Sequence, residues 1–375
     1  MTKRVVTSDR LMQPIAHFSH GVRVGGTIHL GAAAGVDRTR RLVGTTVGVG
    51  DMPAQTEQLF ANLRLALEAL GGAWQDVVKV KTYIVDWRDL PAYDAVHARE
   101  FGALRPAVSK VGTWGFPLPQ IMLETELVAC LEGTKRIGSG SVRAGGLHYC
   151  TAAPVDARGE VAAPFDPRAQ SEQALRNLAA TLEQAELRLQ DVVMLTVSLA
   201  DIRALPAFEE GFQRFFRPPY PARSVAGVPL ARSGQLVEVE SIAAYGGGQP
   251  VGEAVPGTAA SPPGMLAGDW LFVSAQAGGD EPGVERQTRR AWERIAATAE
   301  AAGMTLDDVV RTNNILTDWR FYAGFNAGYG AFVTRPYPPR ATVHAALADP
   351  GACVQVEAVA HRGGGDATVL EARDQ

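Results

Sequence analysis

Three segments of the chain combine residue types that could bind and activate a carboxylated molecule. The first two are Tyr220-Pro221-Ala222-Arg223-Ser224 before Val237-Glu238-Val239-Glu240, and Tyr337-Pro338-Pro339-Arg340-Ala341-Thr342 before Gln355-Val356-Glu357. The third is Arg105-Pro106-Ala107-Val108-Ser109-Lys110 before Glu124-Thr125-Glu126, with valine at the arginine position. A guanidinium offers two parallel donors to a carboxylate, and a glutamate can hold a water and accept its proton.

Both features have simpler interpretations. An arginine that follows a proline at the start of a strand is often a partner in a surface ion pair. Glu238 alternates with Val237 and Val239, so its face of the strand could simply be solvated. The chemistry therefore depends on the elements that position these side chains.

The whole chain of 375 residues is built from a threefold repeat. An Asp-Val-Val segment followed by an alternating strand pattern occurs at Asp76-Val77-Val78, Asp191-Val192-Val193 and Asp308-Val309-Val310. The period of about 116 residues is far longer than a solenoid repeat, so each copy is expected to be a whole domain.

The flanks of this segment repeat as well. Apolar residues at a spacing of three and four predict a helix before it, with Leu59, Leu63, Ala66 and Leu70 in copy one and Leu175, Leu178, Leu182 and Ala185 in copy two. Gly71-Gly72 and Gly303 are expected to end two of these helices. Each unit is predicted to run β-β-α-β-α-β, an α/β (α+β) fold with two helices on one face of a mixed sheet.

These units predict domains at 1–131, 141–245 and 265–361, followed by a disordered tail at 362–375. The linkers Glu132–Gly140 and Gly246–Gly264 are rich in glycine, serine or proline. One face of each sheet would still need cover, and three copies can supply it mutually around a pseudo-threefold axis. Three domains without a mutual interface are the alternative.

Composition limits the classes of partner. The net charge of −4 provides no global field for nucleic acid or an anionic membrane. Met1–Gln13 has no apolar core of a signal peptide, and no stretch is long and apolar enough to span a bilayer, so a cytoplasmic location is expected. Three widely spaced cysteines argue against a disulfide framework or a cysteine-rich zinc site. His17, His20 and His29 lack a supporting carboxylate, and no metal is predicted.

The final third of each copy resembles the signature of the RidA/YjgF family, also labelled endoribonuclease L-PSP. The resemblance implies chorismate-mutase-like domains arranged as a pseudo-threefold trimer with a central barrel. It also implies ligand pockets between domains and cofactor-free deamination of 2-imino acids, with the motif arginine binding the substrate carboxylate. Arg223 and Arg340 match that arginine, whereas Val108 does not.

Other pocket positions of the family map onto each copy in turn. The family's serine after the second strand corresponds to Gly31, Thr151 and Ser274; its asparagine on the second helix corresponds to Asp94, Glu209 and Asn326; its cysteine beyond the arginine corresponds to Lys110, Val225 and Thr342; its final-strand glutamate corresponds to Glu124, Glu238 and Gln355; and its N-terminal tyrosine corresponds in copy one to Phe18. Compared copy by copy, no copy keeps the complete set.

We therefore predict a hydrolytic deaminase of a small carboxylated imine or enamine, with Arg223, Arg340 and Glu238 as catalytic residues. Substrate contacts are predicted for Thr151, Ser274, Asn326, Thr342 and Glu209. The incomplete sets leave two alternatives open: a specialised biosynthetic enzyme, for example a chorismatase-like one, or a non-catalytic binding or regulatory protein. The acidic balance argues against ribonuclease action. A monomeric pseudo-trimer is expected, and further oligomerisation is left open.

Overall fold

Three similar α/β lobes form the protein in a computed structural model, which describes residues 2–46, 49–138, 140–252 and 261–372. Lobe one contains β1 (Lys3–Ser8), β2 (Gly21–Val24), β3 (Thr27–Ala33), β4 (Thr45–Thr46), β5 (Val49–Gly50), α1 (Met52–Ala69), β6 (Val77–Ile84), α2 (Leu90–Phe101), β7 (Ala107–Gly112) and β8 (Leu123–Cys130).

The other two lobes repeat this order without the small β4–β5 hairpin. Lobe two contains β9 (Lys135–Arg136), β10 (Ser141–Ala144), β11 (Leu147–Ala152), α3 (Pro167–Gln184), β12 (Val192–Leu199), α4 (Leu205–Phe215), β13 (Ala222–Gly227) and β14 (Val237–Ala244). Lobe three contains β15 (Gln249–Val251), β16 (Gly264–Ala267), β17 (Trp270–Ala277), α5 (Val284–Ala301), β18 (Val309–Leu316), α6 (Tyr322–Gly330), β19 (Arg340–His344) and β20 (Val354–His361).

The predicted helices form where the apolar spacing placed them. Leu59, Leu63 and Ala66 of α1 are buried against the sheet of lobe one, and Leu175, Leu178 and Leu182 of α3 are buried in lobe two. Asp51 and Asp166 begin these helices, since their carboxylates accept hydrogen bonds from backbone N–H groups in the first turn. Gly71 and Gly303 follow two helix ends with positive φ angles of 78° and 70°, as the helix-ending role requires.

The predicted order β-β-α-β-α-β was wrong in omitting two strands per lobe. The structure adds a first strand (β1, β9 or β15) and a strand after the second helix (β7, β13 or β19). The first strands β9 and β15 are short and lie within the segments interpreted as linkers. The strand after the second helix runs parallel to β6, β12 or β18, as a crossover helix allows.

The tail predicted to be disordered is instead ordered over Ala367–Ala372, which forms β21. This strand pairs in parallel with β1 across six residues from Lys3–Ala367 to Ser8–Ala372. The edge of β1 would otherwise leave backbone N–H and C=O groups unpaired, which explains why the segment orders there. Residues 373–375 lie outside the described part of the chain.

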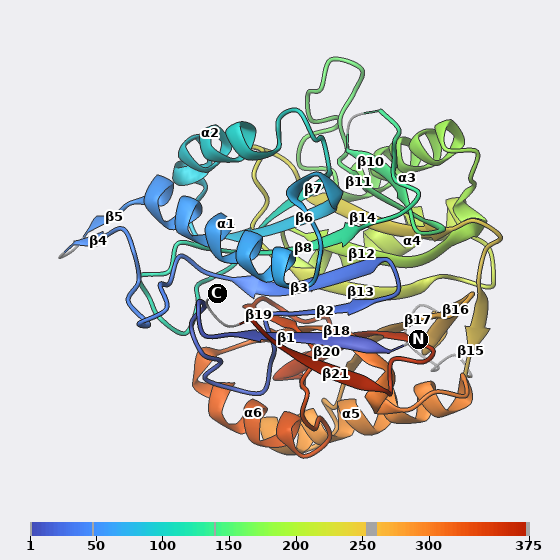
Figure 1. Ribbon diagram of the computed structural model, residues 1–375. Coiled ribbons are helices and arrows are strands. Elements are labelled where there is room, and N and C mark those ends of the chain that lie inside the picture. Colours follow the sequence, from blue (N-terminus) through green and yellow to red (C-terminus); the bar gives the residue numbers. More distant parts are fainter. Residues whose placement is uncertain (1, 47–48, 139, 253–260, 373–375) are drawn as a thin grey trace.

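The three lobes close into a ring with helices outside and sheets inside (Figure 1). Strand β7 packs on β11, β13 on β17 and β19 on β3, so lobe three returns to lobe one. Head-to-tail contacts of this kind close when the rotation fits a threefold arrangement. The expectation of a pseudo-threefold trimer is thereby confirmed. The strands are hydrogen-bonded in separate sheets, so a closed central barrel is not confirmed.

Two kinds of core hold the ring together. Each lobe has its own core between the helices and the sheet. A further core joins the inner faces of all three sheets and includes Val22, Tyr149 and Phe272. The second faces of the sheets are thus covered by one another, as the sequence predicted.

A cluster of buried charges lies beside this shared core. Arg311 of lobe three donates to both oxygens of Glu126 of lobe one at 2.6 and 3.2 Å. Lys79 and Lys81 of lobe one contact Glu240 of lobe two at 2.8 and 2.5 Å. Burial alone would raise the pKa of Glu240, but the two lysines hold it well below its usual range. These pairs cross two different lobe boundaries, so they tie lobe one to both of the other lobes.

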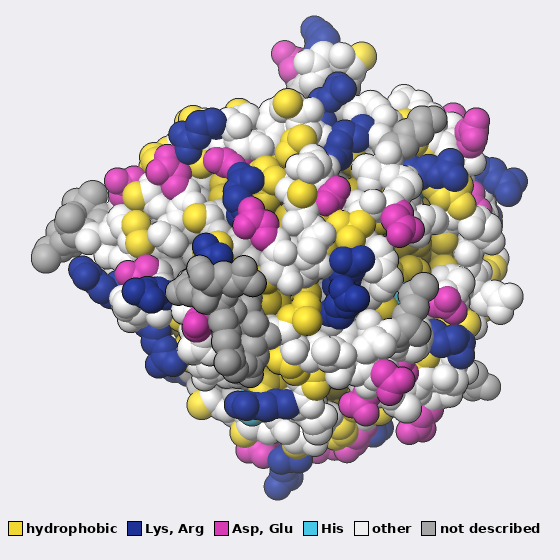
Figure 2. Space-filling view, viewed as in Figure 1, with side chains coloured by type: hydrophobic (Ala, Val, Ile, Leu, Met, Phe, Trp, Pro, Cys, Tyr) yellow, Lys and Arg dark blue, Asp and Glu magenta, His cyan; other side chains and the backbone are white. Residues whose placement is uncertain are grey.

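On the face shown in Figure 2, basic and acidic side chains are interspersed. Among the described residues, no helix is long and apolar enough to cross a membrane. That part of the chain likewise contains no cluster of three or more His, Cys, Asp or Glu side chains suited to a metal ion.

Candidate active site between lobes three and one

The three boundaries between lobes, called seams here, share one construction. In each seam the strand that carries the arginine position packs on a strand of the following lobe. The residues at the glutamate position face that same strand: Ser109 donates to Glu238 at 3.3 Å in seam 1–2, and Gln355 donates to Ser224 at 3.3 Å in seam 2–3. Each arginine position is therefore combined with the glutamate position of the next lobe.

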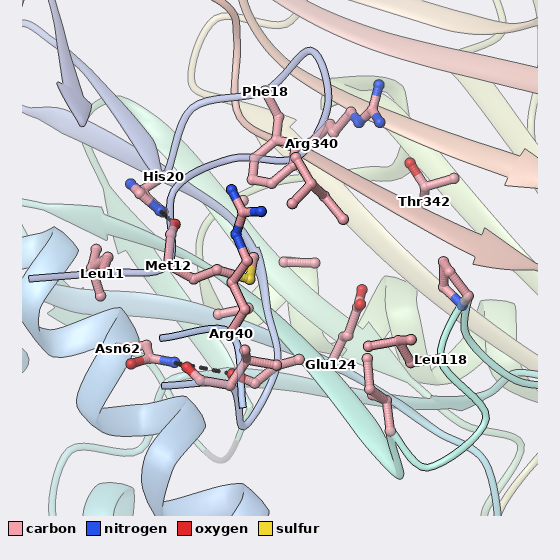
Figure 3. A pocket seen from close by; sticks show the side chains of 18 of the residues that line it. Leu11, Met12, Phe18, His20, Arg40, Asn62, Leu118, Glu124, Arg340 and Thr342 are labelled. Carbon is pink, nitrogen blue, oxygen red and sulfur yellow. Dashed lines mark hydrogen bonds between the residues drawn. The ribbon is translucent and has the colours of Figure 1, made fainter. Parts of the chain in front are cut away.

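Seam 3–1 contains a cavity of about 280 Å³ (Figure 3). Lobe one supplies most of its wall and lobe three supplies one side, with Trp319, Tyr322, Arg340 and Thr342. The lobe-one wall is largely apolar and includes Leu11, Met12, Ile15, Phe18, Ala33, Ala34, Leu63, Leu118 and Ile121. A volume near ~300 Å³ and an apolar lining with a few polar groups are typical of small-molecule sites.

Arg340 is held rigidly at one end of this cavity. Its Nη2 donates to the Asn326 side-chain oxygen at 2.7 Å, and the guanidinium lies over the rings of Tyr329, Phe325 and Phe18, with centroids 4.7, 5.2 and 5.7 Å away. The residue is only 5% exposed, yet its Nη1 has no hydrogen-bond partner among the described residues. A buried cationic donor without a partner is costly, which makes Arg340 a candidate for binding an anion.

Glu124, on β8 of lobe one, lines the same cavity. Burial raises the pKa of Glu124 to about 8, with Glu126 adding to the rise and Arg340 opposing it. Its side chain points into the cavity in Figure 3. A carboxyl group with a pKa close to neutral can both give and take a proton, which is the requirement for general acid–base chemistry.

The backbone also shapes the cavity. Strands β3 and β8 shift register between Leu30 and Ala33, so Gly31 and Ala32 form a bulge that lines the cavity. A Cβ atom at Gly31 would lie 3.0 Å from the backbone nitrogen of Arg340 and 3.1 Å from its carbonyl oxygen. Glycine at the family's serine position therefore lets β19 approach β3 closely.

Thr342 completes the lobe-three side of the site. It lies on β19 two residues beyond Arg340, and its hydroxyl accepts a hydrogen bond from the Asn314 amide at 3.3 Å. It lines the cavity, as the predicted substrate contact requires. Asn326, also a predicted substrate contact, accepts the hydrogen bond that positions the Arg340 guanidinium.

Seam 2–3 has an arginine that is already neutralised. Both terminal nitrogens of Arg223 donate to the carboxylate of Glu209, at 2.6 and 3.1 Å, and the arginine is 9% exposed. Glu209 occupies the helix position that Asn326 occupies in lobe three. Ser274 contacts the backbone of Arg223, since its hydroxyl accepts from that N–H at 3.0 Å and donates to the Pro262 carbonyl at 2.6 Å. In this seam the arginine is therefore paired with an acid from its own lobe.

Seam 1–2 has the glutamate without the arginine. Glu238 is 8% exposed and accepts from Ser109 and from Gln235 at 3.2 Å, and burial raises its pKa to about 7. Lys110 pairs with Asp94 at 2.6 Å beside Val108, where the arginine would stand. Thr151 is half-buried on β11, the strand against which β7 packs.

Arg223 and Glu238, both predicted to be catalytic, belong to different seams. Glu238 faces lobe one, and the position facing Arg223 is Gln355. Glu124, which the sequence mapped to the family's glutamate position but which was not predicted to be catalytic, lines the same cavity as Arg340. The sequence comparison looked for the arginine and the glutamate within the same copy. Combining the arginine of each copy with the glutamate of the next copy, where copy one follows copy three, would have paired Glu124 with Arg340.

Taken together, fold and seams define a fused pseudo-trimer, and among the described residues one seam cavity is lined by both an arginine without an ion-pair partner and a glutamate. The sequence profile of the family described as endoribonuclease L-PSP matches residues 8–131, 139–245 and 254–362. The chain belongs to this family, the RidA/YjgF proteins, and contains three copies of its domain.

Some known proteins match about one third of the chain, and one solved structure matches most of it. A 2-iminobutanoate/2-iminopropanoate deaminase of Dermatophagoides farinae is 32% identical over 131 residues, which are 35% of this chain and 98% of that protein. The crystal structure of RidA from the Antarctic bacterium Psychrobacter sp. is 32% identical with a TM-score of 0.28, covering 30% of this chain and 98% of that one. A chorismatase structure covers 76% of this chain and 93% of its own, with a TM-score of 0.53 and 14% identity, and so shares the fold.

Proposed function

We propose that this protein hydrolyses a small carboxylated imine or enamine to the oxo acid and ammonia, in seam 3–1 and without a cofactor. The observation that carries the proposal is the unpaired, buried Nη1 of Arg340 in the same cavity as Glu124, whose pKa is near neutral. The similarity of one third of the chain to an imine deaminase supports this reaction class.

Arg340 would bind the substrate carboxylate. Asn326 is a neutral hydrogen-bond partner, so it positions the Arg340 guanidinium without neutralising its charge. In seam 2–3 the equivalent Glu209 cancels it. The substrate carboxylate would thus take the place in seam 3–1 that Glu209 occupies in seam 2–3, and its imine carbon would extend toward Glu124.

Glu124 would carry the proton through the reaction. In its protonated form it gives a proton to the imine nitrogen, and the resulting carboxylate accepts one from the attacking water, which forms the carbinolamine. It then protonates the amine nitrogen and recovers a proton from the hydroxyl group as the C=O bond forms and ammonia leaves. Substrate and water are consumed, and the oxo acid and ammonia are the products. An enamine would enter after protonation at carbon.

A single chain supplies every group in this scheme, so a monomer is sufficient. The test is to generate 2-iminobutanoate with an amino-acid oxidase and to follow imine loss by the wild type and by Arg340→Ala. Loss of charge-assisted hydrogen bonds worth about 3 kcal/mol predicts a fall in kcat/KM of roughly 150-fold.

The matched control is the double variant Arg223→Gln with Glu209→Gln, which removes the internal ion pair of seam 2–3 while keeping both positions polar. It should deaminate at the wild-type rate. Equal activity of wild type and Arg340→Ala would overturn the proposal. Binding of 2-oxobutanoate by a wild type without turnover would favour a non-catalytic binding protein instead.

A further inference from the structure

One cationic side chain at the cavity has no role in the proposed reaction. Arg40 lies in the turn between β3 and α1 and lines the cavity in seam 3–1. Figure 3 shows its side chain running past Met12 toward Phe18, and Glu124 and Thr342 line the same cavity. It comes from lobe one, whereas Arg340 comes from lobe three, so the cavity has arginines on two different walls.

The turn that carries Arg40 is built rigidly. The Asp37 side chain accepts hydrogen bonds from the backbone of Thr39 at 2.8 Å and of Arg41 at 2.9 Å. The Asp37 backbone N–H donates to the Arg41 carbonyl at 2.9 Å, and Val36 bridges to Leu42 across the base of the turn. This network fixes the backbone at residue 40 with a φ of 68°, in the left-handed region.

Lobe two contains the same turn with a different residue at this position. Asp156 accepts from the backbone of Arg158 and Glu160, and Val155 bridges to Val161. The residue equivalent to Arg40 is Gly159, with a φ of 80°. Glycine adopts this conformation without penalty, whereas an arginine is strained there. Lobe one thus retains a strained arginine where its own repeat shows that glycine suffices.

Arg40 is exposed to solvent, and its side chain also lines the cavity. In lobe two the acid Glu160 follows the glycine and lies 3.7 Å from Arg158. In lobe one the equivalent position is Arg41, so lobe one lacks the acid that follows the turn glycine in lobe two. A strained arginine kept at a cavity wall, where lobe two has glycine, points to a ligand group of opposite charge.

We propose that Arg40 is a specificity-determining residue that binds a second anionic group, so that the preferred substrate is a dicarboxylic 2-imino acid. This inference rests on the proposed function and specifies its substrate class. The 2-carboxylate binds Arg340, the imine carbon lies beside Glu124, the methylene groups contact the apolar wall, and the distal carboxylate meets Arg40. The cavity of about 280 Å³ accommodates such a chain and exceeds the needs of a three-carbon imino acid.

The experiment compares two imines of equal chain length, 2-iminoglutarate and 2-iminopentanoate, each generated in place by an amino-acid oxidase. The wild type should have the higher kcat/KM for 2-iminoglutarate. Arg40→Gly should lower that value at least tenfold, mainly through KM, and leave 2-iminopentanoate unchanged. Because lobe two carries glycine here, this variant should fold as well as the wild type, and a thermal melt checks that it does.

Two controls separate specific binding from a general charge effect. Arg38→Ala removes an exposed charge from the same turn outside the cavity wall and should change neither substrate. Calorimetry with 2-oxoglutarate and 2-oxopentanoate measures binding without turnover, and only the first should weaken in Arg40→Gly. Unchanged discrimination in Arg40→Gly, with 2-iminopentanoate still deaminated, would overturn this inference and leave the proposed function standing. Failure of the wild type on both imines and on 2-iminobutanoate would overturn the proposed function itself.

Discussion

Replacing Glu124 with glutamine should change how the stability of the protein depends on pH. Burial raises the pKa of Glu124 from 4.5 to about 8. The folded chain therefore binds this proton more tightly than the unfolded chain between those values. The contribution of Glu124 to stability is fully present below pH 4.5, falls as the pH rises toward 8, and is constant above that.

The magnitude follows from the displacement of the pKa. Moving a carboxyl pKa from 4.5 to about 8 corresponds to roughly 5 kcal/mol of free energy between acidic and basic pH. For a cooperative chain of 375 residues, an unfolding entropy near ~2.1 cal/mol/K per residue converts this into about 6 °C in Tm. Glutamine has nearly the same shape as glutamate and no charge, so the Tm of the variant should not show this fall as the pH rises.

The assay is thermal unfolding of wild type and Glu124→Gln from pH 5 to 9, with the exposed Glu68→Gln as the control. The Tm difference between wild type and Glu124→Gln should widen in favour of the variant by several degrees as the pH rises. The same variant should lose roughly 100-fold or more in kcat, since the proton carrier is gone. Parallel melting curves at all pH values would refute the assignment of a buried, proton-binding Glu124.

Three further outcomes follow from the structure. Gly31→Ala places a Cβ about 3 Å from the backbone of Arg340, so it should lower kcat/KM about tenfold while the Tm changes little; an unchanged rate would contradict the close approach of β3 and β19. Glu240→Gln leaves two buried lysines without their carboxylate and should cost about 3–5 kcal/mol in denaturant unfolding; a cost below about 1 kcal/mol would count against the network. Deleting residues 367–375 should lower the Tm and promote self-association detectable by light scattering, because it exposes the edge of β1; a strictly monomeric, equally stable product would argue against β21.

The sequence predicted the parts of the fold that depend on local pattern. The leucine spacing of α1 and α3 located both helices, and the Asp-Val-Val segments identified the repeat. The strands β7, β13 and β19 were missed because they are short, lie at sheet edges and follow prolines, so alternation is weak there. The ordered β21 was missed because its pairing partner, β1, is at the opposite end of the chain.

The site was predicted only in part, for a geometric reason. Arg340 and Asn326 belong to one lobe, and their correspondence with the family's pocket located both. Glu124 belongs to the next lobe around the ring. The sequence pattern does not predict which lobe packs against the strand that carries Arg340. The ion pair of Arg223 with Glu209 was also missed. Glu209 lies on α4 and Arg223 on β13, so their contact depends on how the helix packs beside the strand, which the sequence pattern does not give.

The closed ring has a consequence for how the protein behaves on dilution. A pocket built between separate subunits disappears when those subunits dissociate, whereas here a covalent chain keeps lobes three and one at a high effective concentration of each other. Specific activity should therefore stay constant down to nanomolar enzyme. Fusion also allows each boundary to change independently. One chain can therefore have a cavity with an unpaired arginine nitrogen at one boundary, and an ion pair and a lysine–aspartate contact at the two equivalent places.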